Sequence, residues 1–224
     1  TDLFATPSPQ SDIIIINGTY TTDNGKHWMY LGGGNYEGEG SIAFSPLDSN
    51  LMVVNLGFSE KGMDTFLHKG WWRHVSPPLI SDGAIRFNPH NPHQVCGCGR
   101  SGLWCVGDSI FFKPFDITAP AEAPPREITY LTPQDWDKRA EYEALDFTYH
   151  PERDGTYYLV TRHTLPYPVT GVRQSHVQYS DDFGATWRRL YTELHAWFYQ
   201  IIVHPGKPDI ILVACNRGLL RSTD

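Results

Sequence analysis

The sequence predicts an all-β fold made of repeated four-stranded antiparallel units. Two repeated patterns and the composition support this prediction. The 224 residues include 20 Gly, 17 Pro and 13% aromatic residues, which suit short strands joined by tight turns better than helices. A chain of this length can bury a sizeable core.

The first pattern is an apolar strand, a proline, a short polar turn and a strongly apolar strand. Five or six positions separate each proline from the first apolar residue of the next strand. Proline fixes φ and lacks an N–H donor, so it ends a strand where the hydrogen-bond ladder stops. The five copies start near Pro7, Pro46, Pro89, Pro151 and Pro205.

Each copy is followed by a third strand, a turn and a fourth strand, so the repeat is an antiparallel meander of about 40 residues, as in a propeller blade. We therefore expect residues 1–224 to form a single β-propeller, or part of a larger one, with about five blade units and a truncated last blade. We expect residues 118–144 and 162–176 to be insertions.

The second pattern is Ser/Thr-x-Asp-x-Gly-x-x-Trp. It reads TTDNGKHW at Thr21–Trp28 and SDDFGATW at Ser180–Trp187, and it begins again as STD at Ser222–Asp224. Because the third copy stops inside the pattern, we expect the natural polypeptide to continue. The residues of the pattern are Thr21, Asp23, Gly25 and Trp28, then Ser180, Asp182, Gly184 and Trp187, and finally Ser222 and Asp224.

This pattern resembles the Asp box, or BNR repeat, of sialidase-like β-propellers, and the resemblance extends to xyloglucanase and sortilin-type propellers. The resemblance implies that the Asp boxes lie on the face opposite a functional site. From the residues themselves we expect a structural role. The aspartates should accept hydrogen bonds from turn N–H groups, the glycines should have positive φ, and the tryptophans should be buried with a bonded indole N–H.

Strand order then sorts the loops. If the strands of each unit run outward, the proline turns and Asp boxes share one face. The loops between second and third strands and the crossovers between units share the other face, where we expect function. The second strands of three successive units end near Arg100, Arg162 and Arg217. These arginines could converge on a carboxylate or sulfate, as the resemblance to sialidases implies, or they could be solvated or paired with acids of neighbouring loops.

Other candidates lie in the same loops. Tyr36, Trp197 and Tyr199 could stack on a sugar or anchor a protein interface. Glu37 and Glu39 are candidate ligand-binding residues in the crossover GGGNYEGEG, although solvated loop acids are the more ordinary interpretation. The residues give no catalytic pair, and the Phe/Tyr-Arg-Ile-Pro motif of sialidases is absent.

We therefore favour a non-catalytic recognition or assembly propeller that binds a glycan or protein partner as part of a larger protein. The alternative is a glycoside hydrolase of sialidase-like or xyloglucanase-like type. No cofactor or metal site is indicated, because His90, His150 and His204 look like repeat-position residues. We expect the protein to be extracellular, on a cell surface or on a virion.

Charge and cysteines set further limits. The net charge of −7 argues against nucleic acid or anionic membrane as a partner, and no apolar run is long enough to insert into a membrane. The four cysteines are too few for a disulfide-dense scaffold. Cys96 and Cys105 could form a cross-strand disulfide around a turn at Gly99–Gly102, or remain two buried thiols, which is the interpretation we favour.

Overall fold

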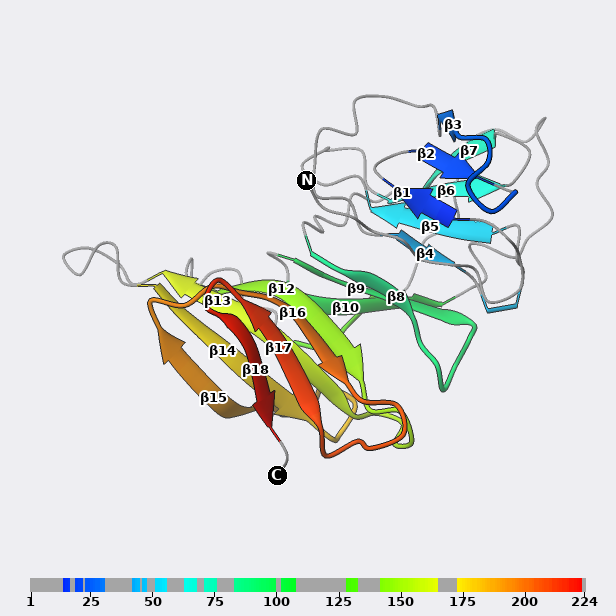
Figure 1. Ribbon diagram of the computed structural model, residues 1–224. Coiled ribbons are helices and arrows are strands. Elements are labelled where there is room, and N and C mark those ends of the chain that lie inside the picture. Colours follow the sequence, from blue (N-terminus) through cyan, green and yellow to red (C-terminus); the bar gives the residue numbers. More distant parts are fainter. Residues whose placement is uncertain are drawn as a thin grey trace. The chain divides into compact units, whose positions relative to one another are not determined.

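The computed structural model describes residues 14–16, 19–21, 23–30, 42–44, 46–47, 51–55, 63–67, 71–75, 83–99, 102–107, 128–132, 142–164 and 173–222. These residues form eighteen strands in five sheets (Figure 1), which confirms the all-β class. Among them, no helix is long and apolar enough to cross a membrane. The chain divides into two compact units: residues 1–96 with 106–128, and residues 97–105 with 129–224.

The first unit contains two antiparallel sheets whose strands pair in sequence order. Strands β4 and β5 flank Pro46, as the proline pattern predicts, whereas Pro7 lies outside the described residues. One sheet consists of β1 (Ile14–Ile16), β2 (Thr19–Thr21) and β3 (Met29–Tyr30). The other consists of β4 (Ile42–Phe44), β5 (Leu51–Asn55), β6 (Met63–Leu67) and β7 (Trp71–Val75).

A third sheet has the order β11-β10-β9-β8. Its strands are β8 (Ile85–Phe87), β9 (Gln94–Gly99), β10 (Gly102–Gly107) and β11 (Ile128–Tyr130). Strand β11 lies inside the stretch 118–144 that we expect to be an insertion. Just after it, the Leu131 N–H donates to the Leu103 carbonyl at 2.8 Å, and the Thr132 hydroxyl accepts from the Leu103 N–H at 3.1 Å.

The cysteines of this sheet correct one expectation. Cys96 on β9 and Cys105 on β10 are disulfide-bonded, so our preference for two buried thiols is wrong. The neighbouring strands β9 and β10 bring both fully buried side chains together, which favours the bond over two separate thiols. Cys98 and Cys215 are free and buried.

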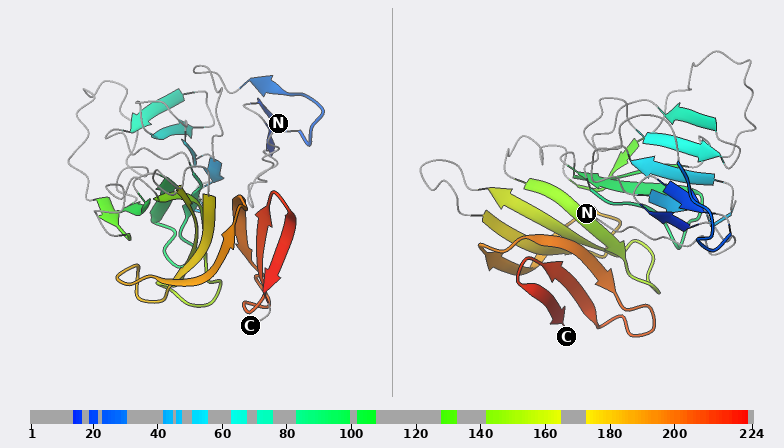
Figure 2. Two further views of the ribbon diagram at one scale, coloured as in Figure 1. Left: turned by 90° about the vertical axis from the view of Figure 1, so that its left-hand side faces the viewer. Right: turned by 45° about the horizontal axis from the view of Figure 1, so that its top comes forward.

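The second unit contains two further antiparallel sheets, again with strands paired in sequence order (Figure 2). One consists of β12 (Tyr142–Tyr149), β13 (Tyr157–Thr164), β14 (Arg173–Ser180) and β15 (Arg188–Leu194). The other consists of β16 (Phe198–Val203), β17 (Ile211–Cys215) and β18 (Gly218–Ser222). Strands β13 and β14 therefore occupy both ends of the predicted insertion 162–176.

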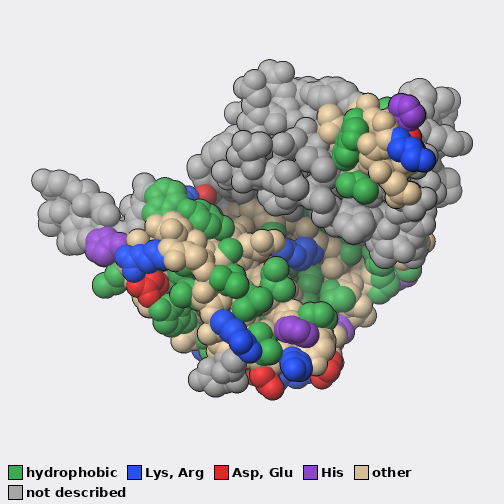
Figure 3. All heavy atoms as spheres, in the orientation of Figure 1, with side chains coloured by type: hydrophobic (Ala, Val, Ile, Leu, Met, Phe, Trp, Pro, Cys, Tyr) green, Lys and Arg blue, Asp and Glu red, His purple; other side chains and the backbone are tan. Residues whose placement is uncertain are grey.

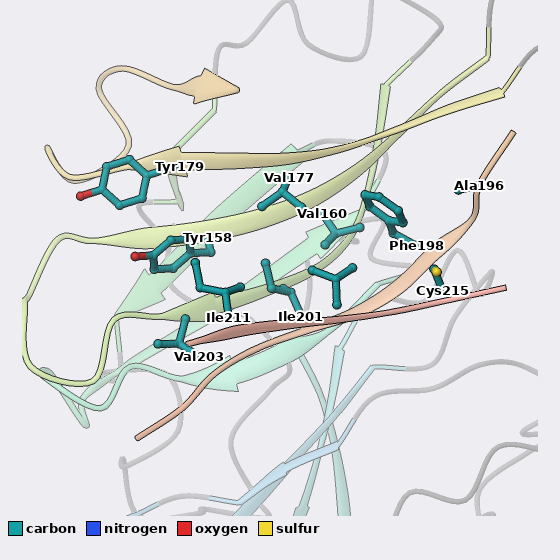
Figure 4. Close-up of a cluster of buried hydrophobic side chains, with 11 residues drawn as sticks. Tyr158, Val160, Val177, Tyr179, Ala196, Phe198, Ile201, Val203, Ile211 and Cys215 are labelled. Carbon is teal, nitrogen blue, oxygen red and sulfur yellow. The ribbon is translucent and has the colours of Figure 1, made fainter. Parts of the chain in front are cut away.

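One apolar cluster joins these two sheets (Figure 4). Burial alternates along β17, as expected of a strand with one face in the core. A polar contact supplements the cluster, because the buried Asp146 carboxylate on β12 accepts the Ile201 N–H of β16 at 2.8 Å. The cluster contains Tyr158, Val160, Val177 and Tyr179 from the β12–β15 sheet, and Ala196, Phe198, Ile201, Val203, Ile211, Val213 and Cys215 from the β15–β16 connection and the β16–β18 sheet.

The proline turns share a hydrogen-bond pattern. The residue before the proline donates its N–H to a carbonyl six positions later, from His150 to Thr156 at 3.0 Å and from His204 to Ile210 at 2.9 Å. Asn88, before Pro89, makes the same bond to Gln94 at 2.9 Å. In the second unit, the two turns repeat at a spacing of 54 residues, from His150 to His204.

The Asp boxes form matching networks in the two units. In the first, the Thr21 hydroxyl accepts the Gly25 N–H at 3.0 Å, and Asp23 Oδ1 accepts the His27 N–H at 2.9 Å. The Trp28 indole donates to the Gly25 carbonyl at 3.1 Å. Gly25 has a φ of 85°, as predicted. Trp28 is 43% exposed, however, so the expectation that its ring is buried is wrong.

In the second copy, Ser180, Asp182 and Gly184 repeat these bonds, and Gly184 has a φ of 81°. The Trp187 indole donates to the Gly184 carbonyl at 3.1 Å and also to the Leu131 carbonyl at 2.7 Å. A Cβ at position 184 would lie 2.5 Å from that Leu131 oxygen. The second Asp box is therefore fixed by a neighbour as well as by its own turn. Asp224 of the third copy lies outside the described residues.

Candidate functional site

The loops of the second unit sort onto two ends. At one end, the Asp-box turn contacts the proline turn, because the Phe183 N–H donates to the Gly155 carbonyl at 2.9 Å. At the other end, the crossover between β15 and β16 contacts the turn between β17 and β18, through Trp197 and Asn216. The loop arrangement that we expect from strand order is therefore found in this unit. We call the second end the crossover surface.

Trp197 is held in place by its neighbours. The Asn216 side-chain oxygen accepts the Trp197 N–H at 2.9 Å, and the Asn216 N–H donates to the Trp197 carbonyl at 3.0 Å. On either side, the Ser175 hydroxyl donates to the Ala196 carbonyl at 2.8 Å and accepts the Phe198 N–H at 3.3 Å. These bonds fix the short crossover, so the partly exposed indole is preorganised.

The indole also contacts a charged pair. The Arg162 guanidinium carbon lies 5.4 Å from the centre of the Trp197 ring, within range of a cation–π interaction. The same guanidinium binds the carboxylate of Glu143, which lies directly opposite Arg162 on β12. Arg162 is thus held between a carboxylate and an aromatic ring at the edge of the crossover surface.

A second charged pair lies at the end of β15. Arg217 Nη1 lies 3.0 Å from Glu193 Oε1, and the Arg217 side chain is largely exposed. The Tyr191 hydroxyl donates to the same carboxylate, and this hydrogen bond raises the pKa of Tyr191. Arg162 and Arg217 therefore each have a glutamate partner.

The predicted site residues are distributed as follows. Arg162, Arg217 and Trp197 lie on or beside the crossover surface, and Tyr199 near the start of β16 is 54% exposed. Both arginines pair with acids, which is the second of the two interpretations that the sequence left open. Arg100, Tyr36, Glu37 and Glu39 lie outside the described residues.

Sequence reasoning missed four residues of this surface: Glu143, Ser175, Glu193 and Asn216. Glu143 falls in a stretch that we expect to be an insertion, and only the β12–β13 register places it opposite Arg162. Asn216 could have been predicted from the sequence, because asparagine side chains in turns often form hydrogen bonds with backbone groups. Ser175 and Glu193 carry no comparable local signal.

The face of the β12–β15 sheet that points away from the apolar cluster carries two buried histidines, His163 and His176. Their ring centres lie 6.3 Å apart. Burial, together with the neighbouring Arg189 and His163, lowers the pKa of His176 to about 4. His176 is therefore neutral at physiological pH, and its Nδ1 lies 2.9 Å from the Thr192 hydroxyl. Within the described residues, no three His, Cys, Asp or Glu side chains group to hold a metal ion.

The antiparallel sheets and their sequence-neighbour pairing define a propeller-like all-β protein. No family model and no curated protein sequence matches the chain. Solved structures do match it. YCF48 from Cyanidioschyzon merolae superposes with a TM-score of 0.58 at 14% identity, covering 99% of this chain and 72% of that one.

Two structures of the GH74 group match as well. The GH74 xyloglucanase of Xanthomonas campestris gives a TM-score of 0.58 at 10% identity over 95% of this chain. An ancestral GH74 enzyme gives 0.50 at 12% identity over 96%. The chain spans only 34% of the length of each of these two proteins. At such low identities the similarity concerns the fold alone.

Proposed function

We propose that the chain is a β-propeller of about five four-stranded blades, the last truncated, which binds a glycan or protein partner without catalysing a reaction. The observation that carries the binding role is the preorganised Trp197. Three bonds from Asn216 and Ser175 side chains fix the short crossover around it, and they hold the partly exposed Trp197 in one position.

The chemistry of the surface supports recognition rather than hydrolysis. Tryptophan and arginine are enriched among residues that dominate binding energy, and an indole also stacks on sugar rings. Glycosidic hydrolysis needs two carboxyl groups facing one bond at a defined separation. Glu143 and Glu193 instead each bind an arginine. An extracellular, cell-surface or virion location fits the disulfide between Cys96 and Cys105, which persists in oxidising surroundings.

The test compares the wild-type protein with Trp197→Ala. Binding is measured by calorimetry with a xyloglucan oligosaccharide and with sialyllactose, and protein partners are captured in the native source by cross-linking and then purified. We expect the substitution to weaken binding to the recognised ligand by about tenfold or more. Trp28→Ala removes an exposed tryptophan of an Asp box and should leave binding unchanged.

Two results would contradict the proposal. If the wild type and Trp197→Ala bind every recognised ligand with equal affinity, the crossover surface is not the binding site. Release of reducing sugar from xyloglucan or of sialic acid from sialyllactose would establish the alternative, a glycoside hydrolase. YCF48 and the xyloglucanase serve as fold comparisons only.

A further inference from the structure

Strand β15 is an edge strand of the β12–β15 sheet. Within the described part of the chain it pairs with β14 alone, so no described strand uses the main-chain groups along its other edge. Three large apolar side chains of this strand are exposed: Leu190 at 45%, Tyr191 at 44% and Leu194 at 49%. Figure 3 shows hydrophobic and charged side chains together on the part of the surface where Figure 1 places β15. Such an edge is a template for pairing with another strand.

A bulge shifts the register of β15. Val177 on β14 pairs with Tyr191, whereas the next residue, Gln178, pairs with Arg189. Leu190 is therefore an extra residue on β15. In a regular strand, residues three positions apart point to opposite sides of the sheet. The bulge therefore reverses the sides on which the side chains before Leu190 lie.

As a result, a row of three side chains lies on the side of β15 that faces the apolar cluster. The Arg188 guanidinium carbon lies 4.4 Å from the centre of the Tyr179 ring, and the Tyr191 ring stacks on Phe198 with centres 6.2 Å apart. Tyr179 and Phe198 both belong to the cluster. Glu193 lies on the same side, where it accepts the Tyr191 hydroxyl. We call Arg188, Tyr191 and Glu193 the edge row, and all of its contacts lie within the second unit.

The edge row is complementary to itself. Its order along the strand is basic, aromatic and acidic. If two copies of β15 pair in antiparallel fashion about a two-fold axis at Tyr191, Arg188 of each copy lies opposite Glu193 of the other, and the two Tyr191 rings are neighbours. Two residues separate Arg188 from Tyr191 and one separates Tyr191 from Glu193, but the spacings match because one of the two is the bulged residue. Opposite charges and aromatic pairs at such positions stabilise a sheet.

The same features disfavour other pairings of this edge. Charged side chains and bulges protect edge strands from indiscriminate pairing. Two copies of β15 in parallel register, or in an antiparallel register centred on the adjacent Arg188 and Arg189, would place like charges opposite each other, which is destabilising. A strand that presents an acid to Arg188 avoids this repulsion, and β15 itself is such a strand.

We propose that β15 is a dimerisation strand. Two copies of the chain join through antiparallel pairing of their β15 strands and form one continuous sheet across a two-fold axis at Tyr191. The Glu193 carboxylate then binds Arg188 of the second copy as well as Arg217 of its own chain, because a carboxylate offers about four lone-pair sites. One strand pair buries less surface than a standard interface, so the dimer is weak and its population rises with protein concentration.

Sedimentation equilibrium of the full-length protein over a range of concentrations tests the charge pairing. Arg188→Glu places two acids opposite each other and should weaken the dimer by about tenfold or more. Arg189→Glu makes the same change in net charge one residue away, on the other side of the sheet, and should weaken it by less than about threefold. Circular dichroism and melting temperature check that both variants fold.

Two results of this experiment would overturn the proposal. A wild-type protein that remains monomeric at every concentration up to about 0.5 mM would leave the edge to a different partner. Equal effects of Arg188→Glu and Arg189→Glu would place the contact between copies elsewhere on the molecule.

Disulfide cross-linking locates the two-fold axis independently. Tyr191→Cys is compared with Leu194→Cys, because Leu194 lies on the same strand with a similar exposed fraction but away from the axis. Directly opposite residues are close enough for a disulfide, so mild oxidation should form the covalent dimer of Tyr191→Cys faster than that of Leu194→Cys by about tenfold or more. Cys98 and Cys215 are buried and provide the same background in both variants. Equal rates would show that the strands do not pair at Tyr191 and would overturn the proposal.

Discussion

The residue before Pro89, Pro151 and Pro205 acts as a cap for the turn that follows. His150 Nδ1 accepts the N–H groups of Glu152 and Arg153, both at 3.1 Å, and His204 Nδ1 accepts the Gly206 N–H at 3.1 Å. In the third sheet, Asn88 Oδ1 accepts the His90 N–H at 2.9 Å. A ring nitrogen and an amide oxygen thus fill one structural position. The histidines need no metal to explain their recurrence.

We predict that His150→Asn leaves the free energy of unfolding within about 0.5 kcal/mol of the wild type, whereas His150→Leu lowers it by about 1–3 kcal/mol. The asparagine can reproduce the bond that Asn88 makes, but leucine leaves two N–H groups of a partly buried turn without their acceptor. Urea unfolding followed by fluorescence measures both values. Equal losses for the two substitutions would show that ring packing, rather than the hydrogen bonds, makes the position important.

At the scale of the element, the Asp boxes show how a turn can depend on a charge. Hydrogen bonds from the His27 N–H, the His27 ring and the Thr21 hydroxyl lower the pKa of Asp23 to about 2. The Thr186 hydroxyl and N–H, together with the Ser180 hydroxyl, lower the pKa of Asp182. Both carboxylates are therefore held ionised by donors of their own turn. The turn is stabilised when they are charged.

The pH dependence follows from the direction of these shifts. A carboxyl group whose pKa is lower in the folded state stabilises the fold above its unfolded value of about 3.9, and this stabilisation is lost as the pH falls through the folded value. We predict that Asp182→Asn lowers the melting temperature at pH 7 and that the difference from the wild type shrinks as the pH falls below about 4. Asp209→Asn, at an exposed turn, is the control. A difference that stays constant down to pH 2 would contradict the role of the charge.

Local chemistry explains why much of these elements was predictable. The strand pairs around Pro46, Pro89, Pro151 and Pro205 and the bonds of the Asp boxes depend on residues within about ten positions. The packing of the Asp-box tryptophans does not. Trp187 bonds to Leu131, 56 positions away, whereas Trp28 is largely exposed, and nothing in the two motifs distinguishes them.

The candidate site was less predictable for the same reason. Trp197, Arg162 and Arg217 were candidates because strand order assigns their loops to one face. Whether the arginines bind a ligand or an acid depends on cross-strand register, which a bulge between Ala144 and Asp146 shifts by one residue. The bonds of Asn216 and Ser175 to the crossover depend on sheet packing, which no local pattern encodes.

At the scale of the whole molecule, the disulfide cross-links two strands of one sheet. We predict that reagent titration of the unfolded, unreduced protein finds two thiols, and that reduction raises the number to four. Replacing Cys96 and Cys105 by serine should lower the free energy of unfolding by about 2–3 kcal/mol, because the closed loop restricts the unfolded chain. The double variant should no longer respond to reductant. Four thiols before reduction would contradict the bond.

The strand order carries a consequence for how the protein is made. In every sheet of the described chain, each strand pairs with the strand next to it in the sequence, and apart from the β10–β11 pair the pairings span short loops. Pairing of this kind keeps contact order low for a β-protein, and domains can fold while later segments are still being synthesised. The β1–β3 and β4–β7 sheets can therefore acquire their pairing while the ribosome is still translating β16–β18.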